Sequence, residues 1–337
     1  MRALVIGGTG FVGRRIVADV VRDGGDALLV HRGGTEPEGL PDCEHLHVDR
    51  SELGGAAAAI RAFRPDAVID TYALSRADAE AVVPHLPDVP RVVLSSMDVY
   101  RAYDWFREGR EGGPVPIGED APLRTSRFPY RGSGQGLDDY EKLDVEEVYL
   151  KNGGTVLRLG VVFGEHDWQR REEFVLRRVR AGRDRIPVGA GDWLWSRCHV
   201  GDVATAALTA ARARTGAGEV YNIAEPRTWT MLGWARRILD AAGHRADLVR
   251  VPDEVLPDDL ALTRSQPQHM LMDVSKAAGE LGWAPADPLR AVAESVRWHL
   301  DNPPEDAGTA DLTADDRALA AADAASPSDL PPEERSA

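Results

Sequence analysis

Lys142 could act together with a proton-transfer group in the segment GLDDYEKLDVE, residues 136–146. If this segment is helical, Asp138 lies four positions earlier and shares a face with Lys142. An adjacent ammonium group stabilises a carboxylate, so Asp138 could act as a base but not as an acid at neutral pH. Asp138 could instead cap the helix or form an ion pair. Tyr140 lies two positions from Lys142, about 200° around such a helix, and is expected to face away.

Three glycines lie in the segment GGTGFVG, between an apolar run and an amphipathic stretch. The first permits a tight turn, the second lets the backbone approach a pyrophosphate, and the third brings a helix close to a strand. The free amide groups of the following helix can bind phosphate oxygens. We therefore expect a dinucleotide to bind at the loop residues Gly7, Thr9, Gly10, Phe11, Val12 and Gly13.

The second expected strand ends in LLVHRGG, which places His31 and Arg32 where NAD-binding proteins usually carry an acidic residue. A guanidinium group suits a 2′-phosphate because it forms charge-assisted hydrogen bonds. The sequence therefore favours NADP. NAD stays open, because Arg32 could also be a solvated residue at the end of a strand.

Short apolar runs alternate with helical stretches over the first three hundred residues, a pattern typical of a parallel sheet with helices on both faces. The fold class is therefore α/β, a doubly wound parallel sheet of the Rossmann type with a smaller interleaved C-terminal substrate-binding part. We expect a dinucleotide-binding core over residues 1–165 and a substrate-binding part over 166–302, with segments that return to the core. Residues 101–135 have no regular period and are expected to form a functional or mobile connection. The expected strands are 2–7, 27–32, 44–48, 67–72, 91–96, 155–164 and 219–224.

The chain of 337 residues has a net charge of −15, unevenly placed. Ten acidic residues and two arginines lie from Asp301 onward, so this end carries −8 and the body about −7. Residues 303–337 are rich in Ala, Asp and Pro and poor in large apolar groups. We expect them to be a disordered acidic tail that folding does not require.

Composition also limits the partners. No apolar run approaches the roughly 20 residues needed to span a bilayer, and no basic stripe suggests nucleic acid as the main ligand. The two cysteines, Cys43 and Cys198, form neither a disulfide framework nor a metal-ligand cluster, which favours a reducing cytoplasm. We therefore expect a cytoplasmic protein with a small-molecule substrate and no metal, nucleic-acid or membrane partner. A homodimer stays open.

Further motifs follow the glycine loop in a recognisable order: HVDRSE, RPDAVIDTYA, VVLSSMDVY, LRLGVVFG, RCHVGDVA, YNIAE and SKAAGELGWAP. Together they resemble the extended short-chain dehydrogenase/reductase family, in its NAD-dependent epimerase/dehydratase branch, over about residues 1–300. The resemblance implies hydride transfer between a nicotinamide cofactor and a sugar nucleotide or a related hydroxyl or carbonyl metabolite. It is specific for the fold and poor for the substrate.

The resemblance also implies roles for single residues. Ser96 would orient the substrate oxygen, and Lys142 would hold the nicotinamide ribose and lower the pKa of a catalytic tyrosine. Asp138 occupies the position of that tyrosine, so Tyr130 and Tyr100 are candidate substitutes because the preceding loop could fold over the site. The further cofactor contacts implied are Asp49, Thr71, Tyr72 and Ala73. The implied substrate contacts are Ser96, Tyr100, Trp195, Arg197 and His199. Of these, Trp195, Arg197 and His199 could alternatively be packed residues.

Two classes of function fit these residues. The first is an atypical NAD(P)-dependent enzyme that performs a reduction, an epimerisation or an elimination. The second is a non-redox NAD(P)-binding sensor or an RNA-associated relative of the family. The retained Ser96 and Lys142 favour the enzyme, the change at Asp138 favours the second class, and the acidic charge weighs against RNA.

Overall fold

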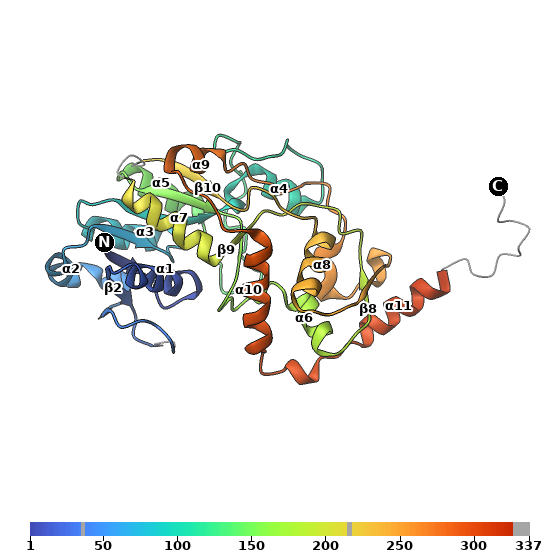
Figure 1. Cartoon of the computed structure of the whole chain (residues 1–337). Coiled ribbons are helices and arrows are strands. Elements are labelled where there is room, and N and C mark those ends of the chain that lie inside the picture. The colour runs from blue at the N-terminus through green and yellow to red at the C-terminus, as the bar shows by residue number, and fades with distance from the viewer. Residues whose placement is uncertain (35–37, 214–217, 326–337) are drawn as a thin grey trace, which may run out of the picture.

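A seven-stranded parallel sheet forms the centre of the protein (Figure 1). The structure is a computed structural model and describes residues 1–34, 38–213 and 218–325. The strands lie in the order β10-β6-β5-β4-β1-β2-β3. Their bounds are β1 (Arg2–Ile6), β2 (Asp26–His31), β3 (Glu44–His47), β4 (Ala67–Asp70), β5 (Arg91–Ser96), β6 (Thr155–Leu159) and β10 (Val220–Ile223). The expected α/β fold with a Rossmann-type sheet is confirmed.

Helices cover both faces of this sheet because successive strand residues point to opposite sides. Val5 and Ile69 face α1 (Phe11–Arg22) and α7 (Val200–Arg212), which pack against each other. Leu4 and Val68 face the opposite layer. That layer holds α2 (Ala57–Phe63), α3 (Arg76–Val82) and α5 (Lys142–Lys151). The central strands are buried on both faces, which explains their continuous apolar runs.

A second apolar core lies under the C-terminal part, where Figure 1 shows α10 running between the sheet and the outer helices. Its elements are α6 (Glu173–Arg180), β8 (Arg185–Val188), α8 (Met231–Ala241), β11 (Asp247–Arg250) and α10 (Pro288–Asp301). The chain returns to the sheet through α7 and β10, while α9 (Ser275–Leu281) packs on β10. None of the described helices combines the length and apolar character needed to cross a membrane.

Two expected segments differ in detail. The expected strand 155–164 divides at Gly160, where a Cβ atom would lie 2.8 Å from the carbonyl oxygen of Ser196. Its second half, β7 (Val161–Phe163), pairs with β9 (Arg197–His199) instead of the main sheet. The expected connection 101–135 begins with a helix, α4 (Arg101–Glu108), and only its remainder is irregular.

The acidic tail is the largest departure. Residues Thr313–Ala325 form α11, which contacts β8 and β11. The buried Asp315 accepts hydrogen bonds from Nε and Nη2 of the buried Arg178, both at 2.7 Å, and Asp316 pairs with Arg183 at 2.6 Å. The expectation of a disordered tail is wrong for 313–325, because these acids meet arginines that lie far away in the sequence. Residues 326–337 lie outside the described residues.

Candidate active site

The glycine loop joins β1 to α1 in a conformation that needs glycine. Gly7 has a φ of +83°, and a Cβ atom on Gly13 would lie 2.5 Å from the carbonyl oxygen of Gly7. Gly10 differs, because a Cβ there would meet only that same oxygen, at 3.7 Å. Gly10 is also the N-cap of α1, and no side chain caps the helix. This open helix start fits the pyrophosphate of a dinucleotide.

The segment expected beside the nicotinamide ribose lies against this loop. The hydroxyl group of Thr71 donates to the carbonyl oxygens of Ile6 and Gly7, at 3.0 and 3.1 Å. Tyr72 is 59% exposed. A Cβ atom added to Gly7 would lie 2.8 Å from the Cβ atom of Tyr72. Thr71 and Tyr72 therefore border the open helix start, as a cofactor site there requires.

Arg50 was not recognised from the sequence, although it belongs to the HVDRSE motif. Its guanidinium group donates to the carbonyl oxygen of Tyr72 at 2.6 Å and to the buried carboxylate of Asp70 at 2.6 Å. Asp70 also accepts a hydrogen bond from Tyr149 at 2.7 Å. Arg50 thus holds the end of β4, and with it Tyr72, in place.

Lys142 lies between the ends of β4 and β5. Its ammonium group donates to the carbonyl oxygens of Ala73, at 2.6 Å, and Leu94, at 2.9 Å. Burial lowers the pKa of Lys142 to about 8, although the nearby acids Asp70 and Asp98 oppose this shift. An ammonium group has three donors, so one remains for a ligand.

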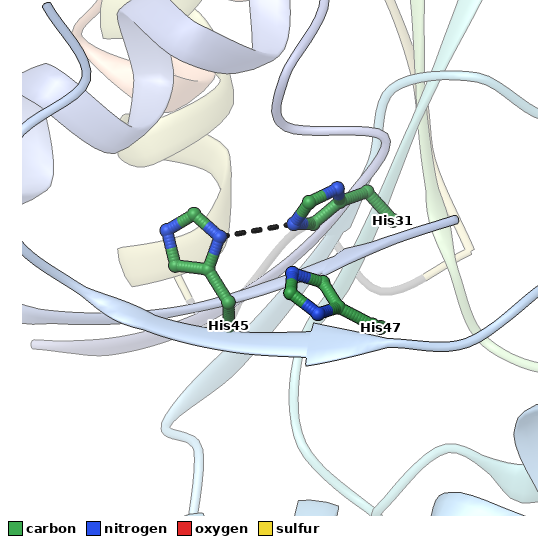
Figure 2. A group of neighbouring side chains, drawn as sticks. All are labelled: His31, His45 and His47. Atoms are coloured by element: carbon green, nitrogen blue, oxygen red, sulfur yellow. Dashed lines mark hydrogen bonds between the residues drawn. The ribbon is translucent and has the colours of Figure 1, made fainter. Parts of the chain in front are cut away.

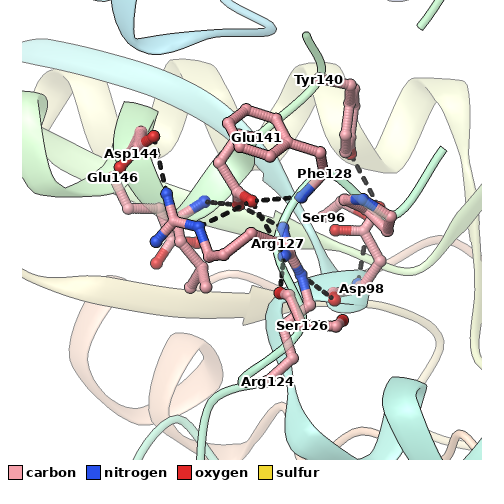
Figure 3. Close-up of polar contacts among 12 residues, drawn as sticks. Ser96, Asp98, Arg124, Ser126, Arg127, Phe128, Tyr140, Glu141, Asp144 and Glu146 are labelled. Atoms are coloured by element: carbon pink, nitrogen blue, oxygen red, sulfur yellow. Dashed lines mark hydrogen bonds and ion pairs between the residues drawn. The ribbon is translucent and has the colours of Figure 1, made fainter. Parts of the chain in front are cut away.

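Asp98 gathers a polar cluster at the end of β5 (Figure 3). Its Oδ2 accepts hydrogen bonds from the hydroxyl groups of Tyr140, at 2.8 Å, and Tyr130, at 3.0 Å. Its backbone N–H donates to Ser96 Oγ at 3.2 Å. Burial raises the pKa of Asp98, against the effect of the hydrogen bond from Tyr140 and the charge of Arg124. Asp98 Oδ1 is buried and has no hydrogen-bond partner among the described residues, so it can accept a hydrogen bond from a ligand or a water molecule.

The expected pairing of Asp138 with Lys142 is wrong. Helix α5 begins only at Lys142, with Glu141 as its N-cap, so the helical spacing does not extend back to Asp138. Asp138 is exposed and accepts a hydrogen bond from the N–H of Gly132 at 2.7 Å. Tyr140 was expected to face away, yet it points into the site, and Lys142 Nζ lies 5.8 Å from the centre of its ring. Tyr130, one of the two proposed substitutes, joins the same cluster.

Glu141 fixes the start of α5 and therefore the direction of Tyr140. Its carboxylate accepts hydrogen bonds from Arg124 Nη1, at 3.0 Å, and from the N–H of Phe128, at 2.8 Å, and pairs with Arg127 Nε at 3.1 Å (Figure 3). Burial alone would raise the pKa of Glu141, but these bonds and charges lower it on balance. The loop over the site is thus tied to the helix that carries Lys142.

Three of the expected substrate residues are packed, which was the stated alternative for Arg197 and His199 but not for Tyr100. Tyr100 is fully buried and donates to Asn222 Oδ1 at 2.6 Å. Arg197 is buried over the ring of Trp234, 4.2 Å from its centre, and burial lowers the pKa of Arg197 to about 10. His199 is buried and caps α7 through Nδ1.

The remaining expected ligand contacts differ in exposure. Trp195 is half-buried and stacks on Trp193, with ring centres 5.1 Å apart. Arg32 is exposed at the end of β2, where it could reach a ligand. Asp49 caps a short 3₁₀ helix by accepting from the N–H of Ser51 at 2.9 Å. His31 is buried, and its Nε2 lies 2.9 Å from Nδ1 of His45.

Comparison with known proteins gives a match to a family model over part of the chain and a shared fold. The family model for the NAD dependent epimerase/dehydratase family matches residues 115–224. The chain also shares its fold with a solved UDP-glucose 4-epimerase of Thermotoga maritima with UDP-glucose, at 19% identity and a TM-score of 0.66, over 90% of this chain and 100% of the other. The matched segment and the shared fold confirm the resemblance to the extended short-chain dehydrogenase/reductase family, in its epimerase/dehydratase branch.

Two further relatives are informative. A solved dTDP-glucose 4,6-dehydratase from Bacillus anthracis in complex with NAD has a TM-score of 0.67 at 16% identity, over 90% of this chain and 97% of the other. The chloroplast stem-loop binding protein of 41 kDa b from Arabidopsis thaliana is 27% identical over an alignment of 345 positions. The alignment covers 94% of this chain and 84% of that protein.

Proposed function

We propose that the chain is an NAD(P)-dependent oxidoreductase or epimerase that acts on a sugar nucleotide or a related hydroxyl or carbonyl metabolite. The observation that carries this proposal is that Ser96, Tyr140 and Lys142 lie together at the ends of β4 and β5. At the end of β4, Thr71 and Tyr72 border the loop that leads to the open start of α1. Ser96 ends β5, whereas Tyr140 and Lys142 flank the N-cap of α5, and the retained lysine is one that the family uses beside its cofactor. The relatives that contain NAD or UDP-glucose support the same class of ligand.

Different groups of the chain would bind the cofactor and position the substrate. The amide groups of α1 would bind the pyrophosphate, and the third donor of Lys142 would hold the nicotinamide ribose. The nicotinamide, when bound, supplies the acceptor or donor of a hydride. Ser96 Oγ would position the substrate oxygen that gains or loses a proton.

Proton transfer is assigned to Tyr140 together with Asp98. Burial and the charge of Asp98 raise the pKa of Tyr140 well above its ordinary value of 10, so a resting phenolate is disfavoured. Tyr140 can instead pass its proton to Asp98 Oδ2, 2.8 Å away, as it takes a proton from a substrate hydroxyl group. The raised pKa of Asp98 makes this carboxylate a suitable acceptor. The reverse transfer would protonate a substrate carbonyl oxygen.

The test is turnover of UDP- and dTDP-hexoses with NAD⁺ or NADP⁺, followed by nicotinamide absorbance and by NMR of the sugar. Tyr140→Phe should lower turnover by about 10²–10⁴-fold, the usual contribution of a general acid–base group. Asp138→Asn is the matched control and should change turnover by less than about twofold, as expected for an exposed surface residue. Wild-type turnover by Tyr140→Phe would contradict the proton path, and no turnover of any sugar nucleotide would contradict the substrate class.

Within this proposal, Arg32 selects NADP over NAD. Its exposed guanidinium group at the end of β2 can pair with a 2′-phosphate. Calorimetric titration of the wild type should show tighter binding of NADP⁺, and Arg32→Ala should remove most of that preference. Equal wild-type affinities for the two cofactors would contradict this assignment.

A second candidate function is binding of stem-loop RNA, favoured by the similarity to the chloroplast stem-loop binding protein over most of both chains. The net charge of −15 opposes it, because phosphate contacts need basic groups. Electrophoretic mobility shifts with a labelled RNA hairpin at low salt would distinguish the two. A salt-dependent shift that NADP⁺ does not affect would support the RNA-binding candidate over the enzyme.

A further inference from the structure

Three histidines gather on one face of the sheet at its last two strands (Figure 2). His45 and His47 are two positions apart on β3, so their side chains point to the same side. His31 ends β2 and is the register partner of His47. The centre of the His31 ring lies 5.1 Å from the centre of the His45 ring and 4.7 Å from that of the His47 ring.

The ring nitrogens converge as metal ligands would. Each histidine offers one nitrogen, and these three atoms all lie within 4.8 Å of one another. His31 Nε2 and His45 Nδ1 are 2.9 Å apart (Figure 2). Tetrahedral zinc with Zn–N bonds of about 2.0–2.1 Å holds its nitrogens about 3.3 Å apart. A small rotation of the rings would therefore place an ion where the two nitrogens now share a proton.

The surroundings of His45 match those of a bound imidazole, because its second ring nitrogen meets a possible acceptor. Cys43 Sγ lies 3.5 Å from His45 Nε2, the ring nitrogen that faces away from His31. This thiol therefore lies on the side of His45 away from the proposed ion, as an outer partner of the ring. The N–H of Gly33 donates to His31 Nδ1 at 3.3 Å, so the proton of a neutral His31 lies on Nε2. Metal binding through Nε2 would move this proton to Nδ1 and break the long contact with Gly33. Gly33 has a φ of +78°, so this turn depends on glycine.

We propose that His31, His45 and His47 bind a Zn²⁺ ion or a similar divalent transition metal through three imidazole nitrogens, with water in the fourth position. No metal was expected from the sequence because its two cysteines form no ligand cluster, whereas these ligands come from two strands. The site goes beyond the proposed function and does not depend on it. His45 and His47 are not among the expected cofactor contacts.

The test uses the full chain, stripped with a chelator and free of nucleotide. Calorimetric titration with Zn²⁺ should show one equivalent bound, and Co²⁺ should give the strong visible absorption of a tetrahedral complex. His45→Gln and His47→Gln should each lower the Zn²⁺ affinity at least tenfold. His85→Gln, at an exposed histidine away from the cluster, is the matched control and should leave the affinity unchanged.

Cys43→Ser should weaken Zn²⁺ binding less than His45→Gln does, because the thiol is only an outer partner. If a variant is less stable, the rise of the melting temperature on adding Zn²⁺ provides a second measurement, since an ion that binds only the folded state stabilises it. One equivalent of Zn²⁺ bound with wild-type affinity by the double variant His45→Gln/His47→Gln would overturn the proposal. So would a Cys43→Ser variant as weak as His45→Gln, because the thiolate would then be a ligand. Since no nucleotide is present, these results are independent of any failure of the proposed enzyme activity.

Discussion

The starts of α1 and α5 differ although both helices border the same site. Helix α1 follows Gly10, has no side-chain cap and carries no acidic residue in its first turn. Helix α5 follows Glu141, whose side chain accepts from the N–H of Leu143 at 3.2 Å and is held by Arg124 and Arg127. One helix start is left open, and the other is closed by the chain's own carboxylate.

The difference separates two tasks. An open helix start presents free N–H groups and a positive dipole end, which suit an anionic ligand. A closed start satisfies these groups internally and leaves nothing for a ligand, but it fixes where the helix begins. At α5 this determines that Tyr140 points to Asp98 and that Lys142 lies at the carbonyl groups of β4 and β5. The first helix would bind the cofactor, and the second positions the reacting groups.

The largest expected effect concerns the closed start. Glu141→Ala should lower the free energy of unfolding by about 3–5 kcal/mol, because it leaves the buried Arg124 without its partner. Urea denaturation of the variant and the wild type gives this difference. Glu147→Ala, at an exposed glutamate on the same helix, is the control and should change stability little. Equal, small changes in both variants would show that the Glu141 cluster does not hold the start of α5.

The second prediction concerns a substitution that would cap the open start of α1. Gly10→Asp adds a carboxylate that can cap the helix, and its Cβ has room, so the fold should tolerate it. The same charge would repel a pyrophosphate. We therefore expect cofactor affinity at least about tenfold below that of Gly10→Asn, which caps the helix without a charge. Equal affinities of the two variants in calorimetry would mean that the α1 start does not bind phosphate.

The third prediction concerns the pH dependence of Lys142. Its pKa is lowered to about 8 by burial, whereas a lysine in the unfolded chain keeps its proton to about 10.4. The unfolded state therefore binds more protons between these values, and this residue's contribution to stability rises with pH across that window. Cofactor binding that requires the protonated form of Lys142 weakens as the pH rises. Cofactor affinity should fall about tenfold between pH 7 and 9, as the protonated fraction does.

Lys142→Met provides the control for this pH profile. It should weaken cofactor binding by about 1–3 kcal/mol at pH 7, as expected for a lost charged hydrogen bond. Its remaining affinity should not change between pH 7 and 9. A wild-type profile as flat as that of the variant would show that the charge of Lys142 does not contribute to binding.

The same comparison explains what the sequence could predict. The glycine loop before α1 could be recognised from the sequence, because only glycine fits at two of its positions. Gly7 has a positive φ, and Gly13 lies too close to the backbone of Gly7 for a side chain. The start of α5 depends on Arg124 and Arg127, which lie in a loop without a regular period. Choosing Asp138 instead of Glu141 as the cap starts the helix three residues too early and places Tyr140 inside it, about 200° from Lys142. In the structure Tyr140 precedes the helix, so this helical spacing does not apply. Asp98 had no sequence signal of its own beyond its place after Ser96.

The smallest expected effect sets the scale for an ordinary cap. Thr230 caps α8 by accepting from the N–H of Gly233 at 3.1 Å, without a charge or an arginine partner. Thr230→Ala should lower the free energy of unfolding by about 1 kcal/mol, and Thr230→Ser should restore most of it. The same urea measurement applies. If Thr230→Ala and Glu141→Ala had equal effects, the capping hydrogen bond alone would account for both. A clear excess for Glu141→Ala would assign the remainder to its arginines, which are what distinguishes the closed start of α5 from an ordinary helix start.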